Sequence, residues 1–414
     1  MKALVFLTDP EPVEPPPPDA PRLVQNLART PMKIEVVPDP PLFGDDWMVL
    51  RTRLCGICGS DTKQVLMDFD DADDNAMTAF ISFPQVLGHE VVATVERVGS
   101  AVSGLEPGQR VVLNPWLSCE PRGVKPVCPA CQEGNYSACW HFADGRLTPG
   151  IHCGNSSDAT GGFAELLPAH QLMAVPVPDD VPDEVAVLAD PFSVSLHAIT
   201  RNPPPTDGKV VVYGAGALGT TATAILRALY PGTEVAVVAR WPAQAALAHR
   251  LGARVFSPEP REELVEQLAA WSGSPLRHPW AGLPVAYPGR IDCVYDTVGS
   301  PETVEVGIRV LGHGGRLVQL GVSSPGRFEW TPWYFKELHL VGSNAFGVEE
   351  VDGVRKHAIE HYLDLVRAGR IDLTGMLTHT FRLEQWRDAF TTLIHQGETG
   401  AIKVAFDFRT GEQR

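Results

Sequence analysis

The chain has 414 residues, more than one ordinary hydrophobic core accommodates, so we expect two domains. Its 44% hydrophobic and 20% charged residues are typical of a globular protein, and no apolar run approaches the roughly 20 residues of a membrane span. The formal net charge of −16 argues against a nucleic-acid partner, because phosphate binding needs clustered lysine and arginine. We therefore expect neither a membrane nor a nucleic-acid partner.

The first residues predict a β-strand. Ala3–Leu7 is an apolar run that ends at Thr8, and it is shorter than the hydrophobic region of a secretory signal. Residues 10–22 contain seven prolines, which exclude a helix or a central strand and predict an extended surface segment. Without a signal peptide we expect a cytoplasmic protein, in which clustered cysteines favour metal binding over disulfides.

Short β-rich segments separated by Gly and Pro turns occupy residues 32–113 and predict a small barrel-like domain. Within it, residues 68–75 form a dense acidic run. We interpret this run as a solvated loop and not as a site for a metal or a cationic substrate, because like charges in a row repel one another and stay hydrated.

After Pro182 the pattern changes to helix-length segments that alternate with fully buried strands, which predicts βαβ units in a parallel sheet. The expected strands are 210–213, 234–238, 291–295 and 316–320. The pattern fades near Ser343, and the remainder, with a helix over 354–368 and a closing strand over 401–406, is expected to return to the first domain. The predicted domain boundaries are 1–182, 183–345 and 346–414, with a zinc lobe at about 115–140 in the first domain.

A glycine-rich loop between the first predicted strand and helix of this region has the pattern G-x-G-x-x-G. Its residues are Gly214, Ala215, Gly216, Ala217, Leu218 and Gly219. Gly214 would permit the tight turn, Gly216 would let the backbone approach a pyrophosphate, and Gly219 would let helix and strand pack closely. The strand–helix–strand context favours a dinucleotide site over a plain glycine turn.

The end of the second predicted strand bears on the choice between NAD and NADP. Ala239 stands where NAD enzymes carry an acid for the ribose 2′-hydroxyl, and Arg240 follows it directly. A guanidinium can donate two hydrogen bonds to a 2′-phosphate, so we favour NADP over NAD. The alternative is an arginine that merely faces solvent.

Four cysteines within a Pro- and Gly-rich segment predict a structural zinc site. They are Cys119, Cys128, Cys131 and Cys139. Four thiolates close a tetrahedral shell and leave no position for substrate, so this site would stabilise a loop and take no part in catalysis.

A second set of residues has the composition of an open zinc site: the thiol of Cys58, the imidazole of His89, and the carboxylates of Glu90 and Asp190. Each is ordinary alone, because a lone histidine or cysteine is more often a buried structural group. Three such ligands around one ion would leave a fourth position for water or substrate.

In these motifs the chain resembles the zinc-containing medium-chain dehydrogenases, especially their polyol, threonine and glucose dehydrogenase branches. The matching segments are 56–61, 88–90, the four-cysteine segment through Cys139, 190–198, 214–219 and 397–404. They follow the family's order from about residue 45 to 406. The resemblance implies an α/β fold with a Rossmann-type doubly wound parallel sheet domain and a GroES-like β-rich catalytic domain.

By this resemblance Cys58, His89 and Asp190 would bind a catalytic zinc, and Glu90 would be an alternating or supporting carboxylate. Asp190 stands where relatives more often have Glu or Cys. The gap between Cys119 and Cys128 is longer than the family's usual two residues, and the stretch 140–160 has no counterpart we can assign.

The resemblance also implies a route for the substrate's proton and groups that hold the nicotinamide. Ser60 would pass the proton outward, with Lys63 where a histidine often completes the relay, and Asp61 would orient a ligand. Val298 and Gly321 would contribute backbone groups to the nicotinamide, with packing at strand ends as the alternative.

The predicted protein is thus a zinc-dependent NAD(P)-dependent alcohol dehydrogenase with two zinc ions per chain, one catalytic and one structural. It would act on a small-molecule alcohol or carbonyl substrate as a homodimer or homotetramer. The nearest alternative is a zinc-free reductase of activated double bonds in the same superfamily. The other is a non-enzymatic binding protein that keeps the fold and the four-thiol zinc site.

Overall fold

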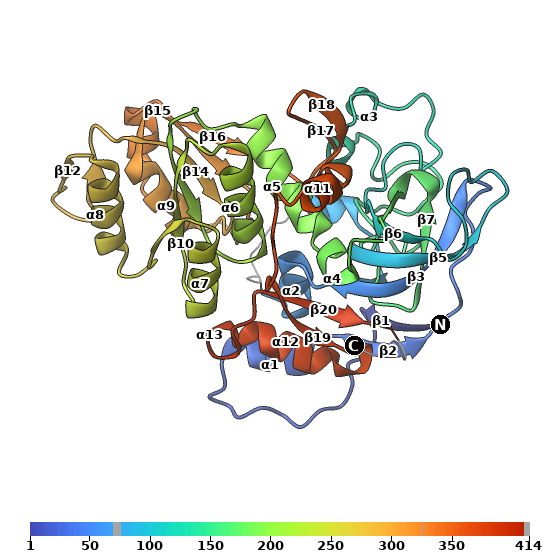
Figure 1. The fold of residues 1–414 in the computed structure, drawn as a ribbon. Coiled ribbons are helices and arrows are strands. Elements are labelled where there is room, and N and C mark those ends of the chain that lie inside the picture. Colours follow the sequence, from blue (N-terminus) through green and yellow to red (C-terminus); the bar gives the residue numbers. More distant parts are fainter. Residues whose placement is uncertain (69–75, 325, 410–414) are drawn as a thin grey trace. The chain divides into compact units, whose positions relative to one another are not determined.

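The computed structural model describes residues 1–68, 76–324 and 326–409. The chain forms two compact units, coloured along the sequence in Figure 1. Unit 1 comprises Met1–Asp190, Lys356–Arg367 and Leu377–Arg414, and unit 2 comprises Pro191–Arg355 and Ala368–Met376. Among the described residues no helix has both the length and the apolar character needed to cross a membrane.

Unit 2 contains a six-stranded parallel sheet in the order β11-β10-β9-β14-β15-β16. In chain order the strands are β9 (Lys209–Tyr213), β10 (Glu234–Val238), β11 (Arg254–Phe256), β14 (Ile291–Asp296), β15 (Leu311–Gln319) and β16 (His339–Gly342). The helices between them are α6 (Ala217–Leu229), α7 (Pro242–Arg250), α8 (Arg261–Ser272), α9 (Pro301–Val310) and α10 (Thr331–Phe335). This is the 3-2-1-4-5-6 order of a Rossmann fold, so the predicted fold class is confirmed.

The sheet order reverses between β9 and β14, which pair directly with Tyr213 opposite Asp296. In open α/β sheets ligands bind beyond the carboxyl ends of the strands at such a switch point. Both strands are buried over most of their length, because helices cover a parallel sheet on its two faces.

Unit 1 is β-rich, as expected. Its main sheet runs β19-β20-β3-β5-β6-β8, with β7 also paired to β3. The strands are β3 (Trp47–Gly56), β5 (Glu90–Val98), β6 (Arg110–Leu113), β7 (Leu166–His170), β8 (Ala174–Pro176), β19 (Leu377–Phe381) and β20 (Lys403–Asp407). A small sheet joins β1 (Lys2–Phe6), β2 (Met32–Val36) and β4 (Gln85–Val86). The last strand, β20, lies antiparallel to β3, with Ala405 opposite Gly56.

The helices of unit 1 that bear on the site are α2 (Gly59–Val65) and the start of α5 (Ala189–Arg201). Others are α1 (Arg22–Arg29), α3 (Pro129–Gln132), α4 (Asp183–Ala186), α11 (Ala358–Arg367), α12 (Trp386–Ile394) and α13 (Gln396–Thr399).

Two predicted elements need correction. The helix expected over 354–368 begins only at Ala358, because Val354–His357 is strand β18, which follows a turn with positive φ at Asp352 and Gly353. The closing strand begins at Lys403 and not at Ala401, since Gly400 still ends the preceding helix in a left-handed conformation. Of the predicted acidic loop, residues 69–75 lie outside the described residues.

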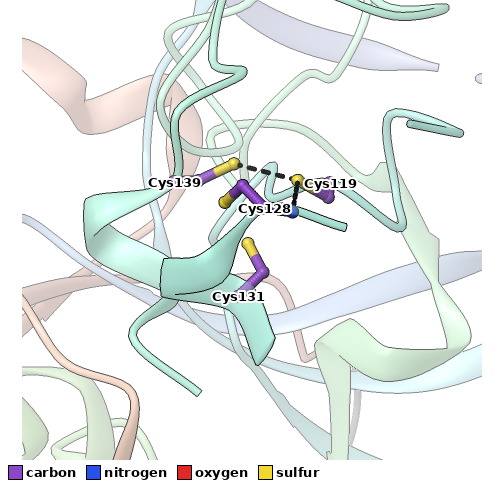
Figure 2. Close-up of side chains that lie close together, drawn as sticks. All are labelled: Cys119, Cys128, Cys131 and Cys139. Atoms are coloured by element: carbon purple, nitrogen blue, oxygen red, sulfur yellow. Dashed lines mark hydrogen bonds between the residues drawn. The ribbon is translucent and has the colours of Figure 1, made fainter. Parts of the chain in front are cut away.

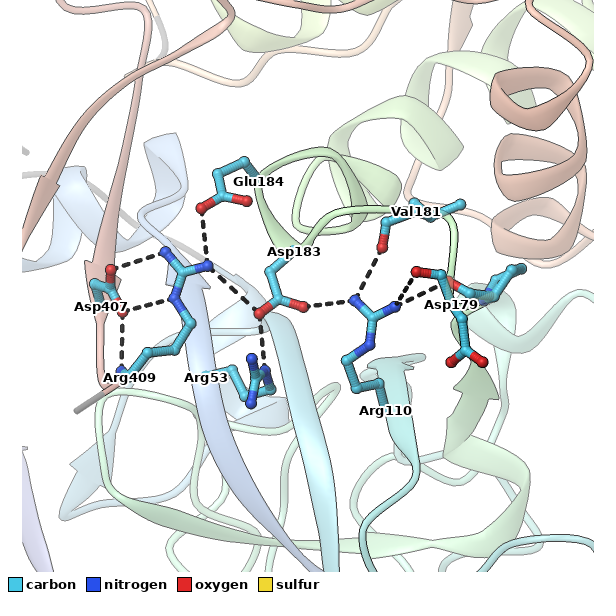
Figure 3. A network of polar contacts seen from close by, with 9 residues as sticks. Arg53, Arg110, Asp179, Val181, Asp183, Glu184, Asp407 and Arg409 are labelled. Atoms are coloured by element: carbon cyan, nitrogen blue, oxygen red, sulfur yellow. Dashed lines mark hydrogen bonds and ion pairs between the residues drawn. The ribbon is translucent and has the colours of Figure 1, made fainter. Parts of the chain in front are cut away.

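Asp183, at the first turn of α4, joins three strands of unit 1 through arginines (Figure 3). Its buried carboxylate accepts hydrogen bonds from Arg53 of β3 at 2.8 Å and Arg110 of β6 at 2.9 Å. Arg409, just after β20, lies 3.5 Å away and also binds Asp407. Charge-assisted bonds of this kind fix the end of the chain against the sheet.

Candidate active site and metal sites

The three glycines of the loop after β9 serve three different needs. Gly214 has φ +95, and a Cβ there would also meet Thr297 and Val298. A Cβ at Gly219 would collide with the carbonyl of Gly214. A Cβ at Gly216 would meet nothing within 4 Å, so the backbone faces open space at the N-terminus of α6. That helix has no acid in its first turn, and its free N–H groups suit a phosphate.

The residues after β10 combine a small buried side chain with an exposed guanidinium. Ala239 is buried and Arg240 is exposed, with its guanidinium carbon 5.9 Å from the ring of Trp241. The exposed guanidinium keeps donors available to a ligand.

The turn after β14 is fixed by the buried carboxylate of Asp296. It accepts hydrogen bonds from the backbone of Val298 at 3.0 Å and Gly299 at 2.9 Å. Burial raises the pKa of Asp296, although these hydrogen bonds lower it in part. A Cβ at Gly321 would collide with the backbone of Thr297 and Val298, so Val298 and Gly321 lie in direct contact. Both belong to unit 2 with the glycine loop.

The four cysteines of the predicted structural site converge (Figure 2). Their sulfur atoms all lie within 4.8 Å of one another, and the sulfurs of Cys119 and Cys139 are 3.6 Å apart. Zn–S bonds of about 2.3 Å in a tetrahedron place sulfurs about 3.8 Å apart, so the set fits zinc. Burial raises the pKa of Cys119 to about 11. Burial thus makes the thiolate form unfavourable, and a divalent cation would offset this cost by stabilising the thiolates.

The open site forms where β3, α2 and β5 meet. Cys58 precedes α2, His89 precedes β5, and Glu90 begins β5. One ligand atom of each lies within 4.8 Å of the others. Burial lowers the pKa of His89, but the negative charges of Cys58 and Asp61 outweigh burial and raise it well above 6.5. The cluster therefore carries excess negative potential, which favours a bound cation.

Asp190 is the fourth predicted ligand and lies in the first turn of α5. Burial raises its pKa to about 7, and Glu90 and Asp61 also raise it. Its Oδ2 and the Nδ1 of His89 are buried without a hydrogen-bond partner among the described residues. Buried polar atoms are normally paired, so these two atoms fit a metal. Asp190 is not in the 4.8 Å group that contains Cys58, His89 and Glu90.

Glu90 has a partner that sequence reasoning missed. The ammonium of Lys403, on β20, forms an ion pair with its carboxylate, and each side chain is 2% exposed. Lys403 also donates to the carbonyl of Ile57 at 2.9 Å. Burial lowers the pKa of Lys403, but Glu90 and Cys58 outweigh it and raise the pKa. Lys403 lies in the segment 397–404 that resembles the family, and this resemblance could have indicated a role at the site.

The residues of the predicted proton relay lie on α2. Ser60 is exposed in its first turn, and Lys63 is half-buried with its pKa lowered by burial. Asp61 is buried, accepts from the backbone N–H of Cys58 at 2.9 Å, and lies 3.7 Å from Nδ1 of His89. Asp61 therefore holds the backbone of one predicted ligand and faces another.

A second imidazole adjoins this cluster and was also missed. The ring centroids of His89 and His152 are 4.5 Å apart. Burial, with a smaller contribution from the charge on His89, lowers the pKa of His152 to about 3. His152 lies in the stretch 140–160, which has no counterpart that the sequence lets us assign and which could shape the substrate pocket.

Comparisons with known proteins agree with this geometry. Residues 44–179 match the alcohol dehydrogenase GroES-like domain, and residues 217–366 match the zinc-binding dehydrogenase family. L-galactonate-5-dehydrogenase of Escherichia coli (strain K12) is 27% identical over 343 residues, covering 82% of this chain and 86% of the relative.

Two solved structures share the fold. That of 2R,3R-butanediol dehydrogenase from Bacillus subtilis has a TM-score of 0.71 at 19% identity, with 99% and 100% of the two chains covered. An alcohol dehydrogenase from Escherichia coli CFT073 in complex with NADH has a TM-score of 0.71 at 22% identity, with 99% of each chain covered. The chain belongs to the medium-chain dehydrogenase/reductase superfamily, among its zinc-binding alcohol and polyol dehydrogenases.

Proposed function

We propose that this protein transfers a hydride between the carbinol carbon of an alcohol, polyol or sugar-like substrate and the nicotinamide of NADP, giving an aldehyde or ketone. One observation carries the proposal: the thiol of Cys58, the imidazole of His89 and the carboxylate of Glu90 lie within 4.8 Å of one another inside unit 1. A closed structural site does not need this mixed ligand set, whereas an open zinc site typically has it.

Cys58, His89 and Asp190 would hold a catalytic zinc, and the four clustered cysteines a structural one. Zinc bound at the first site would supply a Lewis acid for the substrate oxygen. The ion pair with Lys403 restrains Glu90, which supports its role as a second carboxylate. Asp190 would be the third ligand, since its Oδ2 is buried without a hydrogen-bond partner among the described residues. Asp61 would keep Cys58 and His89 in place.

The alcohol's proton would leave through α2. Ser60 Oγ would take the proton from the substrate hydroxyl and pass it to Lys63 Nζ or to water. A half-buried amine with a lowered pKa is suited to this task, because it accepts and releases a proton more readily than an exposed lysine.

The cofactor would occupy the switch point of the sheet in unit 2. The loop from Gly214 to Gly219 would receive the pyrophosphate, and Val298 and Gly321 the nicotinamide amide. Arg240 would bind the 2′-phosphate, since it is exposed beside the small side chain of Ala239.

We also propose a cytoplasmic location and a homodimeric or homotetrameric assembly. All eight cysteines are free, which agrees with a reducing compartment.

A panel of primary alcohols, secondary alcohols and polyols, assayed with NAD and NADP in parallel, tests the function. We expect alcohol-dependent reduction of the cofactor, lost on chelation of the catalytic zinc. Activity only on activated double bonds, with about one zinc per chain, would instead identify a zinc-free reductase. Cofactor binding without turnover of any alcohol would identify a non-enzymatic protein.

A further inference from the structure

His152 borders the candidate catalytic site without belonging to its ligand set. Its ring lies 4.5 Å from that of His89, centroid to centroid, at an interplanar angle of 46°. Among the described residues, Cys58, His89 and Glu90 form a group whose ligand atoms lie within 4.8 Å of one another, and His152 is not a member of it. The ring therefore packs against a predicted ligand without being one itself.

The backbone around His152 is fixed on both sides. Trp116 and His152 form an antiparallel bridge, and Leu117 N–H donates to the carbonyl of Ile151 at 3.0 Å. The N–H of His152 donates to the side chain of Asn155 at 3.0 Å. These bonds fix the backbone that carries the side chain.

The segment before His152 is anchored by the buried guanidinium of Arg122. That group donates hydrogen bonds to the carbonyls of Leu117, Asp144, Leu147, Thr148 and Gly150. Arg122 lies between Cys119 and Cys128, where the gap is longer than the family's usual two residues. Its hydrogen bonds therefore attach the stretch 140–160 to this longer gap. His152 thus stands on a rigid element, as a binding residue requires.

The two ring nitrogens of His152 have different roles. Nδ1 lies 2.7 Å from the carbonyl oxygen of Cys153. A carbonyl only accepts, so Nδ1 carries the hydrogen, and in this tautomer of the imidazole Nε2 is the acceptor. Nε2 has no hydrogen-bond partner among residues 1–68, 76–324 and 326–409, and the residue is only half-buried.

We infer that His152 Nε2 accepts a hydrogen bond from a second substrate hydroxyl, on the carbon next to the one that is oxidised. The inference rests on the proposed function, which puts the reacting oxygen beside His89. In a vicinal diol the neighbouring hydroxyl is one carbon further on and meets the adjacent ring. An acceptor that has no partner among the described residues and is satisfied by such a hydroxyl discriminates against substrates that lack it.

The test compares His152→Phe with the wild type on 2,3-butanediol and on 2-butanol. Phenylalanine keeps a flat ring against His89 and removes the acceptor. We expect kcat/KM for the diol to fall about 10-fold or more, with 2-butanol unchanged. His152→Gln, which restores an acceptor oxygen, should recover part of the loss. His141→Phe is the matched control, because its ring pairs with Asp144 at the surface in the same segment.

Two further readouts separate binding from support of the metal. Zinc content should stay the same in His152→Phe, and calorimetry on the zinc-loaded enzyme should show weaker binding of 2,3-butanediol only. Equal losses on both alcohols, a lost zinc ion, or unchanged diol selectivity would each overturn the inference. If the wild type oxidises no alcohol of the panel described above, the proposed function fails, and the calorimetric comparison still decides whether His152 binds the diol.

Discussion

The ammonium of Lys403 pairs with the carboxylate of Glu90 in the interior of unit 1, where each side chain is 2% exposed. The last strand of the chain thereby places a positive charge beside the candidate catalytic metal site. Lys403 neutralises Glu90, one of its two ligand-type carboxylates. The other, Asp190, has a buried Oδ2 without a hydrogen-bond partner among the described residues.

Removal of this ammonium should destabilise the protein, because a buried charge without its partner is costly. We expect Lys403→Met to lower the free energy of unfolding by about 3–5 kcal/mol. The double variant Lys403→Met/Glu90→Gln should regain more than half of that loss. Urea unfolding of the zinc-loaded proteins measures both, and additive losses in the double variant would show that the two side chains are uncoupled.

Arg240 should determine the cofactor. Loss of its guanidinium removes the expected partner of the 2′-phosphate, so Arg240→Ala should lower kcat/KM with NADP about 10- to 100-fold and change the value with NAD little. Steady-state kinetics with both cofactors measure the ratio. A wild type that prefers NAD, or equal losses with both cofactors, would contradict this assignment.

The four-thiol cluster should hold one zinc ion apart from catalysis. Cys131→Ser removes a ligand from a closed tetrahedral shell, so we expect one zinc fewer per chain and a lower unfolding temperature. Zinc analysis and thermal scanning measure these effects. Cys293→Ala, which removes a buried thiol of unit 2, is the control and should keep all zinc. Full zinc content in Cys131→Ser would refute the site.

Glu349 should contribute stability that depends on pH. Its buried carboxylate accepts hydrogen bonds from His197 at 2.5 Å and Arg201 at 3.1 Å. Burial raises the pKa of Glu349, but these partners outweigh burial and hold it below 4.5. A lowered carboxyl pKa stabilises the folded state fully above the unfolded value, and the effect is lost as pH falls through the folded value.

Glu349→Gln should therefore be less stable than the wild type by about 1–3 kcal/mol near pH 7. The difference should shrink as pH falls below 4.5, where Glu349 becomes protonated first in the unfolded chain and then, at lower pH, in the folded protein. Denaturant unfolding from pH 7 to pH 3 measures it. If the difference in unfolding free energy between the wild type and Glu349→Gln stays constant down to pH 3, ionised Glu349 does not stabilise the fold.

Local patterns in the sequence were sufficient to predict the dinucleotide unit. Its strands are continuous apolar runs, and the loop from Gly214 to Gly219 follows the first of them directly. The same holds for the four clustered cysteines, which lie within one short segment. In these places neighbours in sequence are also neighbours in space, so spacing alone carries the geometry.

Lys403 and His152 could not be predicted as site residues in this way. Lys403 reaches the site because β20 pairs with β3, and a strand register cannot be read from one sequence. His152 reaches His89 through a bridge to Trp116 in a segment without helix or strand periodicity. The start of α11 was misplaced because Val354–His357 continues an apolar and basic pattern that fits either a strand or a helix.

Zinc content and activity of Cys58→Ser test the central claim most directly, since this change removes the thiolate of the open site and spares the four-thiol cluster. We expect the wild type to hold about two zinc ions per chain and the folded variant about one. Alcohol-dependent reduction of NADP should fall at least about 1000-fold. A Cys58→Ser protein that keeps both its zinc and its activity would contradict the account.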